Sequence, residues 1–155
     1  MITPTHESFL LEDVPTYIKN LSQVQKPSFG IMTPQHMVEH LIYVTKVTTK
    51  RYGEPDPKLQ EHQVGMKKFI LSDADFPKNV TPININAELK PLKYDSLEVA
   101  IDDLPKTIKK FYDFYKQNPD FKCYNPHMGE LDFNLCERLH FKHYTHHLKQ
   151  FGLIE

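Results

Sequence analysis

The sequence feature that most constrains this chain is a cluster of histidines in its last predicted helix, residues 131–150. An α-helix turns about 100° per residue, so His143 and His147 lie on one stripe with His140 and Gln150 beside them. A final helix normally turns an apolar stripe toward a small core. Here the best-defined stripe is polar, so the rest of the fold must offer these imidazoles a hydrogen-bonding partner or an ion.

A second histidine pair favours a metal site. His36 and His40 repeat the i, i+4 spacing of His143 and His147, which lets two imidazoles reach one ion from one helical turn. His40 lies on the apolar side of its predicted helix and is the stronger candidate, whereas His36 is expected near the mouth of the site. Metal sites in helical bundles take ligands from facing helices. We therefore expect His40, His143 and His147 to meet around one ion.

The composition bounds the class of protein. A chain of 155 residues suits one domain, residues 1–155, with a single core. Its 19 basic and 20 acidic residues form no block of like charge, so neither nucleic acid nor a membrane surface is an expected partner. No apolar run approaches the roughly 18 residues of a membrane span. Two cysteines do not make a disulfide framework, so a reducing, cytoplasmic location is expected.

Capping signals and apolar periodicity predict a chain of helices joined by stiff loops, since there are twelve prolines and only five glycines. The expected helices cover residues 6–23, 34–51, 56–71, 95–118 and 132–150. Pro105 should kink the fourth of them. The long segment 72–94 holds three further prolines and is expected to cover one end of the fold.

Two stretches of the chain resemble a known superfamily. Thr33-Pro-Gln-His-Met-Val-Glu-His-Leu41 resembles the second helix of the DinB-like superfamily, in which a histidine followed by leucine is a metal ligand. Asn125-Pro-His-Met-Gly-Glu-Leu-Asp132, with the histidines of the last helix, resembles one branch of it that has no assigned activity. In that branch the glycine loop begins with His-Pro, whereas Asn125 holds the first position here and His127 stands two residues later.

This resemblance carries expectations about fold and site. It implies an all-α, antiparallel four-helix bundle (DinB/YfiT-like) with a long crossover loop. It also implies that His40, His143 and His147 are the metal ligands. Members of the superfamily include thiol-dependent transferases, so a thiol or another small molecule is the expected partner. Domains of this branch are also fused to enzymes of aromatic-acid breakdown, which implies an accessory role there.

Three neutral imidazoles suit zinc, nickel or iron(II) and leave one position open for water or substrate. The first hypothesis is therefore a metal-dependent enzyme, either a hydrolase or a thiol-dependent transferase. His140 and Gln150 are candidate catalytic residues that would orient water or substrate, or else they only hydrogen-bond the ligands. Glu39 points away from His40 and is expected to be solvated. Cys136 is either a small buried hydrophobe or a reactive thiol.

Two alternative hypotheses for the function remain open. One is a non-catalytic bundle that binds a metal or small ligand, with the accessory role in aromatic-acid catabolism, and the other is a metal-free interaction bundle. A cavity over the metal would favour the enzyme, and the metal content would test the metal-free case. A homodimer is left open. The site is expected at one end of the fold, walled by residues 29–32 and covered by residues 72–94 and 119–130.

Overall fold

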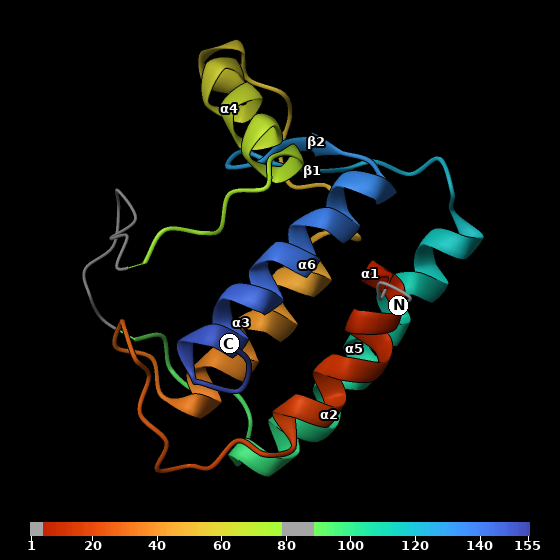
Figure 1. Cartoon of the computed structure of the whole chain (residues 1–155). Coiled ribbons are helices and arrows are strands. Elements are labelled where there is room, and N and C mark those ends of the chain that lie inside the picture. The colour runs from red at the N-terminus through yellow and green to blue at the C-terminus, as the bar shows by residue number, and fades with distance from the viewer. Residues whose placement is uncertain (1–4, 79–88) are drawn as a thin grey trace.

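Helices make up most of the chain, and the computed structural model describes residues 5–78 and 89–155 (Figure 1). The helices are α1 (His6–Ser8), α2 (Val14–Ile18), α3 (Pro34–Val47), α4 (Gln60–Leu71), α5 (Leu97–Gln117) and α6 (Phe133–Gln150). A π-helical segment, η1 (Phe9–Asp13), joins α1 to α2, and a 3₁₀ turn, η2 (Pro57–Leu59), precedes α4. Two strands, β1 (Cys123–Asn125) and β2 (Gly129–Leu131), form a small antiparallel sheet. The helical character is confirmed, whereas the sheet was not predicted.

The predicted helix starts follow from side-chain caps. The Thr33 hydroxyl accepts a hydrogen bond from the His36 backbone amide at 3.2 Å, and Pro34 occupies the first helical position of α3. In the same way the Asp132 carboxylate accepts from the Leu135 amide at 3.0 Å and begins α6. These caps fix the N-terminal ends of the two helices that carry the histidine pairs.

The end of α3 differs from the prediction. The helix ends at Val47 instead of residue 51, because the next residues pair with β1. The Tyr124 amide donates to the Lys50 carbonyl at 3.2 Å, and the Tyr52 amide donates to the Tyr124 carbonyl at 2.7 Å. An extended backbone at residues 50–52 satisfies these groups better than a further helical turn.

The β1–β2 hairpin lies at the start of α6, since β2 leads directly into that helix (Figure 1). The Asn125 side chain accepts from the Met128 amide at 2.9 Å and shapes the turn. His143 and His147 lie in the second half of α6, far along the helix from the hairpin. The prediction that residues 119–130 cover the histidine site is therefore wrong.

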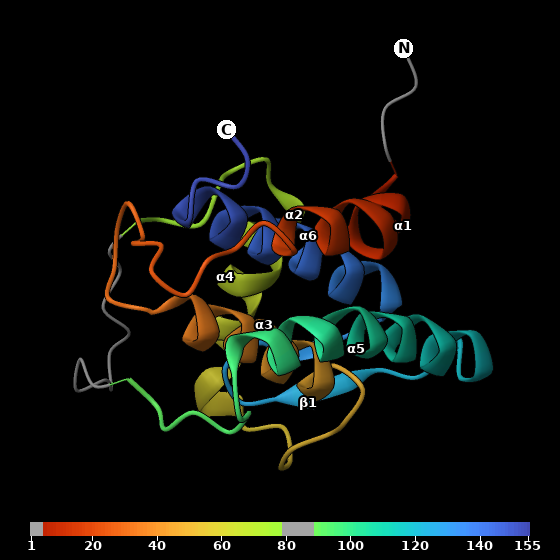
Figure 2. The same cartoon turned by 90° about the horizontal axis from the view of Figure 1, so that it is seen from below.

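The core is formed where α3 packs on α5 and where α6 contacts α3, α4 and the N-terminal helical run (Figure 2). α3 and α6 run in opposite directions (Figure 1). The fully buried apolar side chains include Leu10, Ile18, Met37, Leu41, Ile70, Leu104, Ile108, Phe111, Leu131 and Phe151. Within the described residues, no helix is long and apolar enough to cross a bilayer.

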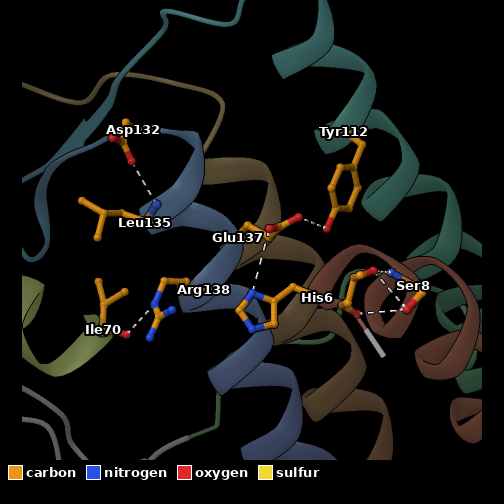
Figure 3. Close-up of polar contacts among 9 residues, drawn as sticks. His6, Ser8, Ile70, Tyr112, Asp132, Leu135, Glu137 and Arg138 are labelled. Atoms are coloured by element: carbon orange, nitrogen blue, oxygen red, sulfur yellow. Dashed lines mark hydrogen bonds and ion pairs between the residues drawn. The ribbon is translucent and has the colours of Figure 1, made fainter. Parts of the chain in front are cut away.

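A polar cluster ties α1, α5 and α6 together at the edge of this core (Figure 3). The Tyr112 hydroxyl donates to the Glu137 carboxylate at 2.6 Å, and His6 Nδ1 lies 3.9 Å from the other Glu137 oxygen. Burial, together with the hydrogen bond to Glu137, raises the pKa of Tyr112, so the phenol stays protonated as the donor. The His6 ring also stacks on Phe141 with centroids 4.3 Å apart.

Replacement of Tyr112 by Phe should lower the free energy of unfolding by about 1–3 kcal/mol, because it leaves a partly buried carboxylate without its donor. Urea denaturation would measure the change. Tyr52→Phe is the matched control, since Tyr52 is 42% exposed, and it should change stability little. Equal effects of the two substitutions would contradict a stabilising role for the Tyr112–Glu137 hydrogen bond.

Candidate metal centre

α3 and α6 bring three imidazole nitrogens to one point. His143 Nε2 lies 3.0 Å from His40 Nε2 and 3.0 Å from His147 Nε2. All three ligand atoms lie within 4.8 Å of one another. His40 lies in the first half of α3 and the other two histidines lie in the second half of α6, so the opposite directions of these helices place them at the same end of the fold.

Hydrogen bonding alone does not satisfy this arrangement. A neutral imidazole nitrogen either carries one proton or offers one lone pair. His143 Nε2 faces two other Nε2 atoms at 3.0 Å, and it can make an ordinary hydrogen bond with only one of them. A divalent ion accepts a lone pair from each nitrogen, and tetrahedral bonds of about 2.0–2.1 Å would separate the nitrogens by roughly 3.3 Å. The donor set and its spacing therefore fit a metal ion.

The electrostatic surroundings keep these rings neutral. Burial, together with the positive charge of Lys90, lowers the pKa of His40 to about 4. Burial likewise lowers the pKa of His147 to about 3 and holds that of His143 well below its usual range. A neutral ring keeps the lone pair that coordination requires, so near neutral pH all three can act as ligands.

Gln150 fixes the tautomer of His147. The Gln150 amide nitrogen donates to the Phe29 carbonyl at 2.9 Å, so its oxygen faces His147 Nδ1 at 2.7 Å. Nδ1 must then carry the proton, which leaves the Nε2 lone pair free for an ion. Gly30 makes room for this amide, because a Cβ atom there would lie 2.9 Å from the Gln150 nitrogen. The geometry thus places Gln150 as a hydrogen-bonding partner of a candidate ligand.

His140 is directed into the core instead. Its side chain is almost fully buried, and Nε2 lies 2.8 Å from the Thr48 hydroxyl. Its ring meets Phe111 edge to face with centroids 4.9 Å apart, and burial lowers its pKa to about 3. His140 Nε2 therefore forms a hydrogen bond with Thr48 and does not face the three-histidine cluster.

Two further residues of α3 hold the segment after residue 88. His36 Nδ1 lies 2.5 Å from the Thr33 hydroxyl, and its Nε2 lies 3.0 Å from the Lys90 carbonyl. Glu39 was expected to be solvated, but its carboxylate accepts from the Lys93 amide at 2.7 Å. The sequence analysis missed this hydrogen bond because the donor, the Lys93 amide, lies 54 positions away in the chain. Helical periodicity does not reveal a contact over such a distance.

The walls of the site come from loops that the sequence only partly indicated. The Phe29 ring lies 5.2 Å from His146, in agreement with the predicted wall at residues 29–32. The Phe76 ring lies 5.4 Å from His143, so the start of the 72–94 segment reaches the site. Residues 79–88 of the expected cover lie outside the described part of the chain. Phe76 carried no sequence signal, since a single phenylalanine in a proline-rich loop has no periodicity.

The remaining cysteines and loop histidines lie elsewhere. Cys123 and Cys136 are buried, free thiols with sulfur atoms 3.5 Å apart near the start of α6. His127, in the hairpin turn, faces His62 of α4 with ring nitrogens 3.3 Å apart. Both of these histidines are exposed.

The chain belongs to the family described as "Protein of unknown function (DUF1569)", whose sequence model matches residues 9–152. The DinB-like assignment made from the two short motifs is therefore wrong, because the family that the chain matches along most of its length is a different one. Neither a curated protein nor a solved structure matches the chain.

The buried histidines predict a pH dependence for the metal-free protein. Burial lowers the pKa values of His40, His140 and His147 from 6.5 to about 4, 3 and 3. Well above pH 6.5 these groups do not make stability depend on pH, because they are neutral in both states. Below that pH the unfolded chain takes up protons that the folded chain does not bind. The free energy of unfolding should then fall by up to about 1.4 kcal/mol per pH unit for each histidine. Urea denaturation of chelated protein from about pH 7.5 to pH 5 measures this slope.

Two variants make the pH prediction specific. His140→Leu should reduce the slope by the contribution of one histidine, whatever its effect on stability at neutral pH. Ile108→Ala, a buried apolar control, should lower stability at every pH and leave the slope unchanged. A slope that is the same in His140→Leu and the wild-type protein would show that His140 is not held neutral by burial.

Proposed function

We propose that this member of the DUF1569 family binds one divalent metal ion through His40, His143 and His147 and is a metal-dependent hydrolase of a small molecule. The observation that carries the metal-binding part of the proposal is the double 3.0 Å contact of His143 Nε2 with two other ring nitrogens. A single proton cannot satisfy both contacts, whereas an ion satisfies all three nitrogens.

Zinc, nickel and iron(II) are the ions that this donor set supports, because all three accept neutral imidazole. An ion held by three imidazoles supplies Lewis-acid chemistry and lowers the pKa of a coordinated water. The chain's own residues hold and shield the site. Gln150 orients His147, Phe76 places an aromatic ring beside His143, and Phe29 places one beside the neighbouring His146. We also propose that α3, α5, α6 and the N-terminal helical run form an antiparallel four-helix bundle, with the site at one end.

Metal binding without catalysis is the second candidate. It is favoured by the lack of an acidic general base beside the ligands, because among residues 5–78 and 89–155 no carboxylate belongs to the three-histidine group. Glu39, the acidic residue beside His40 in the sequence, is engaged with the Lys93 amide and is not a general base. Metal-dependent hydrolysis of a small activated ester such as p-nitrophenyl acetate separates the two candidates: turnover that is lost on chelation and restored by zinc supports the hydrolase.

Protein prepared without a histidine tag should contain one ion per chain by elemental analysis. His143→Ala should abolish the metal content, because His143 lies between the other two ligands. His36→Ala is the matched control and should keep the metal, since His36 contacts Thr33 and Lys90 instead. Chelation should lower the melting temperature by several degrees, as free metal at a thousandfold excess over Kd adds about 4 kcal/mol. Loss of metal without any such shift would contradict the linkage.

Gln150→Ala should weaken metal affinity by about 10–100-fold, the usual effect of removing the partner of a ligating histidine. The physical reason is that His147 Nδ1 loses the acceptor that fixes its tautomer. Competition with a zinc-sensitive dye measures the affinity. Gln25→Ala is a suitable control, because its amide contacts the nearby Phe151 carbonyl and not a histidine. Unchanged affinity in Gln150→Ala would show that this residue does not support the centre.

A further inference from the structure

A cavity of about 270 Å³ lies beside the candidate metal centre. One face of α6 forms part of its lining, with Lys142, Thr145, His146 and Lys149 at helical spacing. The other lining residues are Phe29, Asp75, Phe76, Lys78, Ile154 and Glu155. In Figures 1 and 2 the loop before α3 and the segment after α4 lie at the same side of the molecule, next to the end of α6.

The cavity and the metal centre share a wall of aromatic rings. The His146 ring lies 4.9 Å from His147, and the Phe76 ring lies 5.4 Å from His143 and 5.6 Å from His146. His146 and Phe76 both line the cavity. One layer of side chains therefore stands between the cavity and two of the three candidate ligands.

A buried hydroxyl in the cavity lining has no protein partner. Thr145 Oγ1 is buried and makes no hydrogen bond. Other helical threonines of this chain bond the carbonyl four residues earlier, as Thr45 does to Leu41 at 2.7 Å and Thr107 does to Asp103 at 3.1 Å. Because solvent does not reach this oxygen, Thr145 lines the cavity through its other atoms, and its hydroxyl is not a contact for a ligand there.

The charges around the cavity favour an anion. Three lysines line it against two carboxylate side chains. Lys149 lies 3.7 Å from Asp75, and Lys142 donates to the Ser72 carbonyl at 2.8 Å. Lys78 has no ion pair among the described residues, and its ammonium lies 5.4 Å from the centre of the Phe29 ring. An oxyanion in the cavity would be paired by Lys78.

We propose that this cavity binds a small organic anion, with its carboxylate or phosphate oxygens at Lys78 and a short apolar body against Phe29, Phe76 and Ile154. The anion is the substrate of the metal centre, which it reaches when the Phe76 and His146 side chains between the two move aside, and this second part rests on the proposed function above. The apolar lining selects against inorganic anions, because these would leave the aromatic rings in contact with water.

Nuclear magnetic resonance of the metal-free protein tests the binding site. Titration with hexanoate and with hexyl phosphate should shift the backbone signals of Thr145, His146 and residues 75–78. Whichever of these two compounds binds more tightly shows whether the site prefers a carboxylate or a phosphate group. Hexylamine and 1-hexanol, which carry the same chain without the anion, should produce no such shifts. Equal binding of hexanol, or shifts confined to another surface, would overturn the proposal.

One variant and two controls sharpen this test. Lys78→Gln should weaken binding about tenfold, the usual effect of losing one charge-assisted hydrogen bond. Thr145→Val should change neither binding nor the melting temperature, because its hydroxyl has no protein partner and is not reached from the cavity. Lys110→Gln, on the exposed face of α5, should leave binding unchanged. Unchanged affinity in Lys78→Gln would contradict the assigned contact.

Cobalt(II) loading separates this proposal from the metal centre itself. If cobalt binds and relaxes the protons of bound hexanoate, the anion lies next to the ion and the substrate assignment stands. If cobalt binds without relaxing them, the assignment as substrate fails while the metal centre stands. If the protein takes up no cobalt, the metal centre and the substrate assignment both fail, and hexanoate binding to metal-free protein alone decides the anion site.

Discussion

Three neutral imidazole rings are buried against one another where α3 crosses the end of α6, and the rest of the structure is arranged around that contact. Burial lowers the pKa values of His143 and His147, so these rings stay neutral near neutral pH. Neutral rings do not repel one another as charged rings would, so the close contact is kept. The loop before α3 supplies the Phe29 carbonyl that holds Gln150, and Gln150 in turn holds His147. The contact thus depends on segments that are distant in the sequence.

A second buried polar network lies next to the histidine cluster along α6, toward the start of that helix. The Tyr115 hydroxyl donates to the Thr48 carbonyl at 2.5 Å, and the Thr48 hydroxyl lies 2.8 Å from His140. This network joins α5, the end of α3 and α6, and it lies beside the paired thiols of Cys123 and Cys136. Buried polar groups that are paired in this way favour one packing of the helices over others.

Much of the helical structure could be predicted from local signals. Thr33 and Asp132 cap their helices as expected, and the i, i+4 spacing predicts that His143 and His147 share a face. The hairpin was missed because three-residue strands carry too short an alternation, and its pairing with residues 50–52 depends on tertiary contact. The family was wrongly assigned for a related reason: capped helices with histidines four apart are a physical solution to binding an ion, so short motifs of this kind do not identify ancestry.

The distance in sequence between the three histidines has a consequence for folding. His143 and His147 belong to one helix and can approach an ion as soon as α6 forms, whereas His40 lies 103 residues earlier than His143. Closing a loop of that length is slow compared with forming a helix. An unfolded chain with a transient α6 would therefore hold an ion weakly with two ligands before the third arrives. Metal present during folding would then act first as a nucleus for the last helix and only later as a link between helices.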